Sequence, residues 1–226
     1  MQCSIIIPVL NEAESILQTL KPLQLFRSQG HEVILVDGGS QDNTIEIAQP
    51  WVDLVLSSEK KGRANQMNAG AAHAGKDVLL FLHADTLLYD EALDTLLLQL
   101  ATSRRVWGRF DIRLSSSKFI YRVIETMINW RSRVSGVATG DQAIFVKAYE
   151  FSYVGRFPDF PLMEDVALSK KLKKISRPIC VSTSIMTSSR RWEQFGVIRT
   201  ILLMWRLRLA YFFGVSPQQL VKYYYG

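Results

Sequence analysis

The chain has 226 residues, of which 48% are hydrophobic and 21% charged, with 13 Gly and 7 Pro. This length suits one large domain or one domain with an appendage, and the composition excludes collagenous, low-complexity and disordered classes. Cys3 and Cys180 allow at most one bridge, and no Cys-x-x-Cys is present, which argues against a disulfide scaffold or a zinc site of the usual spacing. The N-terminal sequence does not resemble a signal peptide, so we expect a cytoplasmic protein.

The net charge of +6 is divided unevenly along the chain. Residues 1–100 carry 6 Lys and Arg against 13 Asp and Glu, whereas residues 101–226 carry 21 against 8. We expect the basic half to face an anionic partner such as a phosphorylated ligand, an acidic membrane leaflet or a nucleic acid.

Strand and helix patterns alternate through residues 1–101. Apolar, β-branched runs predict strands over 4–10, 32–36, 51–56 and 77–82, and helical spacing predicts helices over 14–26, from 43, over 63–74 and over 90–101. Such alternation predicts a parallel sheet covered on both faces, with ligands bound beyond the carboxyl ends of its strands. Acidic turns at Glu12, Asp37 and Asp85 fall at those ends.

The alternation weakens after residue 101. Trp107–Leu114 alternates like an edge strand, and Ala143–Val146 is a short predicted strand. Helices are predicted over Phe119–Trp130 and Leu162–Leu172, and Phe195–Phe213 is the most apolar long stretch. Neither an internal repeat nor a linker divides the sequence.

The segment Val36–Asp42 is the first candidate for ligand binding. Asp37 followed by Gly38 and Gly39 lets the backbone approach a ligand while the carboxylate accepts hydrogen bonds from a base or ribose. The alternative is a tight turn in which Ser40 or Asp42 caps the next helix. A dinucleotide fingerprint is absent, because no glycine follows the first strand.

Two further acidic positions suggest chemistry. Asp85 follows a buried strand, where a carboxylate can hold Mg²⁺ or Mn²⁺ together with substrate phosphates, or alternatively cap the next helix. His83 beside it is either a supporting group or a packed core histidine. Glu164 and Asp165 precede an apolar helix and complement its dipole, unless the rigid Pro-containing lead-in holds one of them as a general base.

Five segments in order resemble the motif set of family 2 glycosyltransferases, which have the GT-A fold. They are Pro8–Glu12, Val36–Thr44, Gly62–Gly70, Leu80–Thr86 and the pair Glu164-Asp165, and the resemblance covers about residues 3–175. It implies an α/β, Rossmann-like fold with a mixed, mostly parallel sheet flanked by helices. The third and fourth segments resemble the bacterial subgroup labelled arsenosugar-biosynthesis-type glycosyltransferases. We expect this domain over 1–190 and a C-terminal helical extension over 191–226.

The resemblance also implies roles for individual residues. Donor-binding positions would be Pro8, Leu10, Glu12, Asp37, Gly39, Arg63, Asn68 and Asp85. Asp85 matches the last acid of the metal-binding DxD, whose first acid is replaced by His83, and Asp165 matches the general base of inverting members. Glu164, Arg190 and Arg191 are weaker candidates for acceptor or phosphate contact, the two arginines being otherwise a solvated loop.

The stretch Phe195–Phe213 has 19 residues, near the length of a membrane span, but contains Arg199, Arg206 and Arg208. Arginine near the centre of a spanning helix is costly, so we expect no transmembrane helix. Its aromatic and Leu-rich remainder predicts contact with an anionic leaflet on the inner face of the cell membrane or with a partner, or packing on the core.

The resemblance therefore implies an inverting transfer of a sugar from a nucleotide-sugar donor to an acceptor hydroxyl, assisted by Mg²⁺ or Mn²⁺. The acceptor would be a sugar, a lipid-linked molecule or a small molecule. A nucleotidyltransferase is the nearest rival, although the first strand is not followed by the Gly-rich basic loop it needs. A non-catalytic basic protein that binds membranes or nucleic acid is the other, motivated by Lys170, Lys171, Lys173 and Lys174. We expect no nucleic-acid partner.

Overall fold

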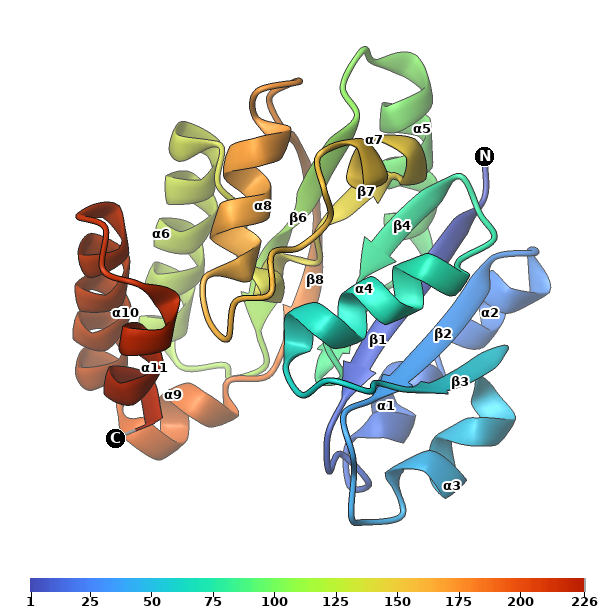
Figure 1. Cartoon of the computed structure of the whole chain (residues 1–226), viewed down its shortest axis with the longest axis horizontal. Helices are drawn as coiled ribbons and strands as arrows, with labels where there is room; N and C mark the ends of the chain where they lie inside the picture. The colour runs from blue at the N-terminus through green and yellow to red at the C-terminus, as the bar shows by residue number, and fades with distance from the viewer. Residues whose placement is uncertain (226) are drawn as a thin grey trace.

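The computed structural model describes residues 1–225 and contains one mixed sheet with helices on both faces (Figure 1). The strand order is β3-β2-β1-β4-β7-β6-β8-β5. The strands are β1 (Cys3–Val9), β2 (Glu32–Asp37), β3 (Leu54–Ser57), β4 (Val78–Phe81), β5 (Thr86–Leu87), β6 (Trp107–Leu114), β7 (Phe145–Lys147) and β8 (Ile179–Thr187). Only β7 and β5 run against their neighbours, which confirms the predicted mostly parallel GT-A sheet.

Helices cover both faces of the sheet, and the C-terminal helices lie at one side of the molecule. They are α1 (Ile16–Leu20), α2 (Leu23–Ser28), α3 (Thr44–Ala48), α4 (Arg63–His73), α5 (Asp90–Thr102), α6 (Phe119–Ser135), α7 (Ala148–Tyr153), α8 (Glu164–Leu172), α9 (Arg190–Phe195), α10 (Val197–Phe212) and α11 (Pro217–Tyr225). Because side chains alternate along a strand, Ile5 and Ile7 of β1 join the core under α1, α2 and α5, whereas Ile6 joins the core under α4 and α8. Each of these isoleucines is fully buried, and burial of one such side chain contributes about 1.5–3 kcal/mol to the stability of the fold.

The first half of the chain follows the predicted alternation with local differences. The helix predicted over 14–26 is two short helices, because Pro22 has no N–H with which to continue the first. The strand predicted from Trp51 begins at Leu54, since Gln49–Trp51 forms a 3₁₀ turn. The helix after Asp85 starts only at Asp90, so Asp85 does not cap it.

The prediction that Trp107–Leu114 is an edge strand is wrong. This segment is β6, and it lies inside the sheet between β7 and β8. Its partner β8 runs parallel to it, and neither β8 nor the two-residue β5 was predicted. The alternation of β6 reflects polar positions such as Asp111 and Arg113, whereas its buried Arg109 forms an ion pair with Asp111.

The apolar stretch predicted over Phe195–Phe213 is interrupted at Gly196, whose φ of 80° ends α9 before α10 begins. The helices α9, α10 and α11 lie beside α6 and α8 (Figure 1). Leu207 and Leu220 pack against Met163 and Val166 at the start of α8. None of the helices within residues 1–225 combines the length and apolarity needed to cross a bilayer.

Candidate active site

Charged side chains from distant segments meet beyond the carboxyl ends of β1 and β4. Glu12 follows β1 and Asp85 follows β4, and Arg190 at the start of α9 lies 3.6 Å from the Glu12 carboxylate. Burial, and next the negative charge of Glu12, raises the pKa of Asp85, whereas Arg190 and Arg63 oppose this change. Two acids and two arginines therefore share one electrostatic environment, as expected for a site that binds a charged ligand.

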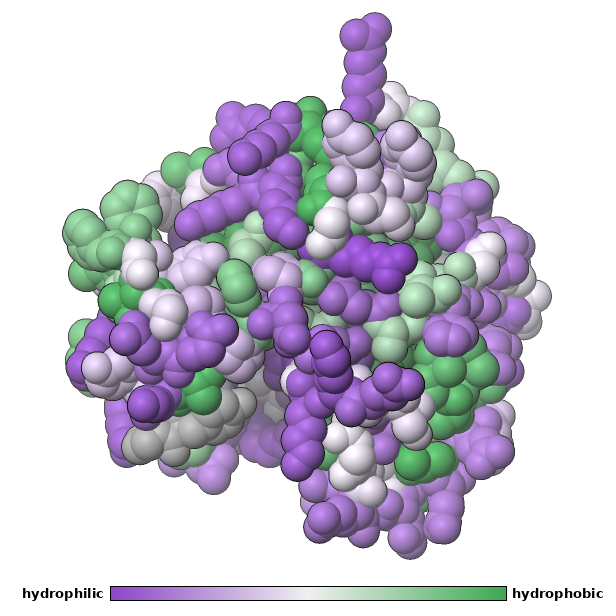
Figure 2. All heavy atoms as spheres, viewed as in Figure 1, coloured by the Kyte–Doolittle hydropathy of each residue, from purple (hydrophilic) through white to green (hydrophobic). Residues whose placement is uncertain are grey.

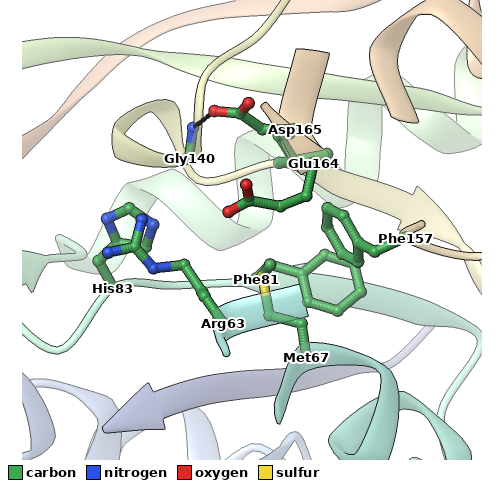
Figure 3. A pocket seen from close by; sticks show the side chains of 9 residues that line it. Arg63, Met67, Phe81, His83, Gly140, Phe157, Glu164 and Asp165 are labelled. Carbon is green, nitrogen blue, oxygen red and sulfur yellow. Dashed lines mark hydrogen bonds between the residues drawn. The ribbon is translucent and has the colours of Figure 1, made fainter. Parts of the chain in front are cut away.

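A small cavity lies next to this cluster (Figure 3). The residues that line it come from α4, from β4 and the turn after it, from the turn before β7, and from the start of α8 and the loop before it. They are Arg63, Met67, Phe81, His83, Gly140, Ile144, Phe157, Glu164 and Asp165. The carboxylate of Glu164 points into the cavity, whereas that of Asp165 turns toward Gly140. The two acids, although adjacent in sequence, therefore face different surroundings.

Hydrogen bonds fix the orientation of Asp165. Its Oδ2 accepts from the backbone N–H of Gly140 at 2.8 Å, and its Oδ1 accepts from that of Val166 at 2.6 Å. Burial raises the pKa of Asp165, and these two bonds oppose the rise because they favour the ionised form. Asp165 is thus a buried carboxylate held in one position.

Glu164 has a different environment. Burial, and next the charge of Asp165, raises the pKa of Glu164 to about 7, while Arg63 acts in the opposite direction. Since two close carboxylates do not ionise together easily, the raised pKa of Glu164 favours its protonated form near neutral pH, whereas the two backbone N–H groups favour the ionised form of Asp165. The pair can therefore combine a hydrogen-bond donor with a base.

This arrangement predicts how stability depends on pH. A carboxyl group whose pKa is higher in the folded than in the unfolded state stabilises the fold fully below its unfolded pKa and loses that contribution as pH rises through the folded value. As pH rises from 4.5 to about 7, ionisation of Glu164 should lower the free energy of unfolding of the ligand-free chain by about 3 kcal/mol at most. Glu164→Gln should therefore exceed the wild type in unfolding free energy by more at pH 8 than at pH 5. Urea unfolding at the two pH values measures this, with the exposed Glu46→Gln as control. A pH-independent difference would contradict the prediction.

His83 packs directly against Gly140. A Cβ atom at position 140 would lie 2.6 Å from Nε2 of His83, so only glycine leaves room for the ring. Burial, and next the positive charge of Arg63, lowers the pKa of His83 well below its usual value, which keeps the ring neutral. The buried Nε2 has no hydrogen-bond partner among the described residues, as expected where a ligand or water completes a site.

The turn Thr139–Gln142 was not singled out in the sequence. The side chains of Thr139 and Gln142 form a capping box, which presents the Gly140 N–H to Asp165. Asp141 Oδ1, Gln142 Nε2 and Arg131 Nε are buried without partners among residues 1–225. Burial, and next the charge of Arg208, lowers the pKa of Arg131 to about 10. The Gly-Asp-Gln triplet before a short strand was the one available signal.

Several of the predicted site residues have structural partners of their own. The Asn68 amide bonds both backbone groups of Phe157, at 2.9 and 3.1 Å, and thereby holds the loop before α8. The buried Asp37 carboxylate accepts from the N–H groups of Gly39 and Ser40 and from the Ser40 hydroxyl. Arg191 lies 4.1 Å from the ring centroid of Tyr224, on the side of the C-terminal helices. These three side chains therefore shape the site's surroundings.

The other predicted residues lie around the strand ends. Pro8 is buried within β1, and Leu10 just beyond it is 54% exposed. Gly39 has a φ of 98° and open space around it, so its turn requires glycine for conformation. Arg63 is exposed at the start of α4, whose Gln66 bonds the carbonyls of Val9 and Val36. Buried Gln66 thus ties α4 to the ends of β1 and β2.

Strained backbone marks the same region. Met163 has a φ of 66° and precedes Glu164, and Ala143 has a φ of 45° and follows the Thr139–Gln142 turn. Non-glycine residues in this conformation cost of order 1–3 kcal/mol and gather at functional sites. Met163 directly precedes the Glu164-Asp165 pair, and Ala143 follows the turn whose Gly140 binds Asp165, which supports the assignment of this region as the site.

A protein-family model matches more than half of the chain. The model described as "Glycosyl transferase family 2" matches residues 4–156. Glycosyltransferase AglE of Haloferax volcanii is 33% identical over 99 residues, which make up 40% of this chain and 33% of that protein. The chain thus spans about a third of the length of this relative.

Solved structures share the fold. TarS of S. aureus in complex with UDP-GlcNAc has a TM-score of 0.70 at 19% identity, with 83% of this chain and 58% of that chain covered. The mannosyltransferase PcManGT from Pyrobaculum calidifontis, in complex with GDP-Man and Mn²⁺, has a TM-score of 0.64 at 21% identity, with 92% and 61% covered. At these identities the likeness establishes the GT-A fold.

Proposed function

Because this chain belongs to glycosyl transferase family 2, we propose that it transfers a sugar from a nucleotide-sugar donor to an acceptor hydroxyl, with inversion at the anomeric carbon. The observation that carries the proposal is the Glu164-Asp165 pair, fixed by the Gly140 turn beside Arg63. We assign the transferase domain to residues 1–190 and a helical extension to 191–226. The donors bound to TarS and PcManGT support a nucleoside diphosphate sugar as substrate.

Asp165 is the proposed general base. Its electrostatic neighbours Arg208 and Tyr211 belong to α10, whereas Glu164 is beside Arg63. The acceptor hydroxyl would approach from the α10 side and give its proton to Asp165 as its oxygen bonds to the anomeric carbon. As that bond forms, the bond from the anomeric carbon to the diphosphate oxygen breaks, and the nucleoside diphosphate leaves. Protonated Glu164, whose carboxyl group points into the cavity, would donate a hydrogen bond to a hydroxyl of the donor sugar.

The departing diphosphate needs positive charge. Arg63 and Arg190 face the strand ends from α4 and α9, and a guanidinium can bind phosphate oxygens through two N–H groups. Pro8, Leu10, Glu12, Asp37 and Gly39 would border the nucleoside in the turns after β1 and β2. Asn68 would act through the Phe157 loop that it holds.

The residues present fit a divalent cation held by few protein ligands. No cluster of three or more His, Cys, Asp or Glu suited to a metal occurs in residues 1–225. Burial, and next the charge of Glu12, nevertheless raises the pKa of Asp85, and a nearby cation would favour its ionised form. Mg²⁺ is commonly held by one or two carboxylates plus substrate phosphates, so Asp85 is the proposed ligand for Mg²⁺ or Mn²⁺. When bound, the ion would neutralise charge that develops on the diphosphate.

Donor binding tests the proposal. We expect saturable binding of at least one of a panel of UDP-, GDP- and TDP-sugars in the presence of Mn²⁺, by calorimetry and as a rise in melting temperature. Slow hydrolysis of that donor should release a nucleoside diphosphate, whereas release of pyrophosphate would indicate a nucleotidyltransferase. The absence of binding by every nucleotide would refute the proposal.

A further inference from the structure

Two exposed apolar stripes lie on neighbouring helices. On α10 the stripe is Ile198, Leu202, Trp205, Leu209 and Phe212, and on α6 it is Ile120, Val123, Met127, Trp130 and Val134. Their spacing alternates between three and four residues, so each set forms one continuous line along its helix. Trp130 is 67% exposed, Trp205 63% and Phe212 75%, which is unusual for large apolar side chains that lie in a row.

The two stripes face the same side of the molecule. Val197 and Ile201 of α10 pack in one cluster with Tyr121 and Ile124 of α6. Further along α10, Arg208 is near enough to Arg131 of α6 that its charge, after burial, lowers the pKa of Arg131. The helices therefore lie side by side and run in the same direction (Figure 1). At 100° per residue, each stripe is displaced from this contact line by roughly 80–110°, in opposite senses on the two helices. Opposite rotations on parallel helices bring both stripes to one face.

Apolar surface is also visible at this edge of the molecule (Figure 2). The green spheres at the left of the view lie where Figure 1 places α10. Phe195 and Phe213 extend the surface at the ends of α10, at 47% and 75% exposure. We call this surface the α6/α10 face, meaning the two stripes with Phe195 and Phe213.

The charge around the α6/α10 face is mostly positive, with Glu193 of α9 as an exposed acid near it. Residues 194–226 contain no Asp or Glu, and Arg199 and Arg206 are exposed beside the α10 stripe. The one acid within α6, Glu125, is buried and paired with Arg122 at 2.8 Å. A symmetric contact with a second copy would bring like-charged arginines together with few acids to pair them. Aromatic and aliphatic side chains bordered by arginines instead match the interface of an anionic bilayer.

We propose that the α6/α10 face docks on the surface of an anionic lipid membrane. The aromatic and aliphatic stripes would enter the boundary between headgroups and acyl chains, with both helices lying in the plane of the surface. Arg199 and Arg206 would contact lipid phosphates. This docking does not depend on the proposed transfer reaction, because it is measured without donor or acceptor.

Vesicle flotation of the whole chain tests the proposal. We expect binding to vesicles of phosphatidylcholine with phosphatidylglycerol, much weaker binding to phosphatidylcholine alone, and loss at high salt. The double variant Leu202→Ser/Trp205→Ser should weaken binding by about 10-fold or more, since it removes two membrane-inserted side chains. The matched control is Leu98→Ser/Tyr149→Ser, which changes residues 64% and 75% exposed on α5 and α7. It should bind as the wild type does.

The electrostatic part has its own pair of variants. Arg199→Gln/Arg206→Gln should reduce the preference for anionic vesicles, whereas the exposed Arg104→Gln should not. Circular dichroism and melting temperature establish that each variant is folded. Failure of the folded wild type to bind anionic vesicles, or equal binding by the Leu202→Ser/Trp205→Ser variant, would overturn the proposal. A dimer in sedimentation that this variant abolishes, without lipid binding, would identify a second copy as the occupant and equally overturn it.

Discussion

Asp165→Asn should lower the turnover rate by roughly 10²–10⁴-fold while donor affinity stays nearly unchanged. The proposed role of Asp165 is to accept the proton of the attacking hydroxyl, an interaction that strengthens only in the transition state. An asparagine can keep the hydrogen bond from Gly140, because its amide oxygen still accepts from the N–H that lies 2.8 Å from Oδ2, and it gives up only the bond from the Val166 N–H. The fold and the adjacent turn should therefore survive the change.

Glu164→Gln is the informative comparison for this prediction. If Glu164 is protonated near neutral pH, glutamine keeps a donor group there, and turnover should fall much less than in Asp165→Asn. The practical first assay is hydrolysis of the donor, with melting temperature in the presence of donor as the measure of affinity. Wild-type turnover in Asp165→Asn, or a parallel loss of donor binding and turnover, would show that the carboxylate is structural or a donor ligand.

The parts of the fold that were predicted have strong local signals. The apolar runs of β1, β2 and β4 and the acidic turns after them stand out because strands buried on both faces read as continuous hydrophobic segments. The strand β8 lacks this signal, since polar Ser182, Thr183 and Ser184 interrupt its apolar positions. Without β8, nothing in the sequence of β6 shows that a partner covers its second edge, and the strand was wrongly placed at the edge of the sheet.

The predicted site differs from the structure for another reason. Sequence motifs identify Asn68 and Asp37 as polar residues at the right positions, but not which atoms satisfy them. The Asn68 partner, Phe157, is 89 residues away in the chain, and the Gly140 N–H that orients Asp165 is 25 residues away. Such pairings follow from how α4, α8 and the Thr139–Gln142 turn converge, which is a property of the packed fold.

Asp85→Asn should weaken divalent-cation-dependent donor binding by about 10–100-fold or more. Removal of a group that only supports a metal ligand typically lowers metal affinity by this factor, and removal of the ligand itself should cost at least as much. Asp85 follows β4 and is the proposed ligand of the cation. An asparagine is a poorer ligand for Mg²⁺ or Mn²⁺ because it carries no charge. Melting temperature measured with nucleoside diphosphate, with and without Mn²⁺, reports the loss. The wild type should show a larger rise with both ligands than with nucleotide alone, and the variant should not.

The same substitution should leave the ligand-free fold intact, which separates the metal role from a structural one. Asp85 caps no helix, since α5 begins at Asp90 with Tyr89 before it. Burial, and next the charge of Glu12, raises the pKa of Asp85, so its ionised form is disfavoured in the fold and its neutral replacement removes that cost. Asp90→Asn, an exposed acid in the first turn of α5, is the matched control and should keep the full effect of Mn²⁺. A Mn²⁺-dependent rise of wild-type size in Asp85→Asn would place the cation elsewhere, because the variant would then bind it without the carboxylate assigned to it.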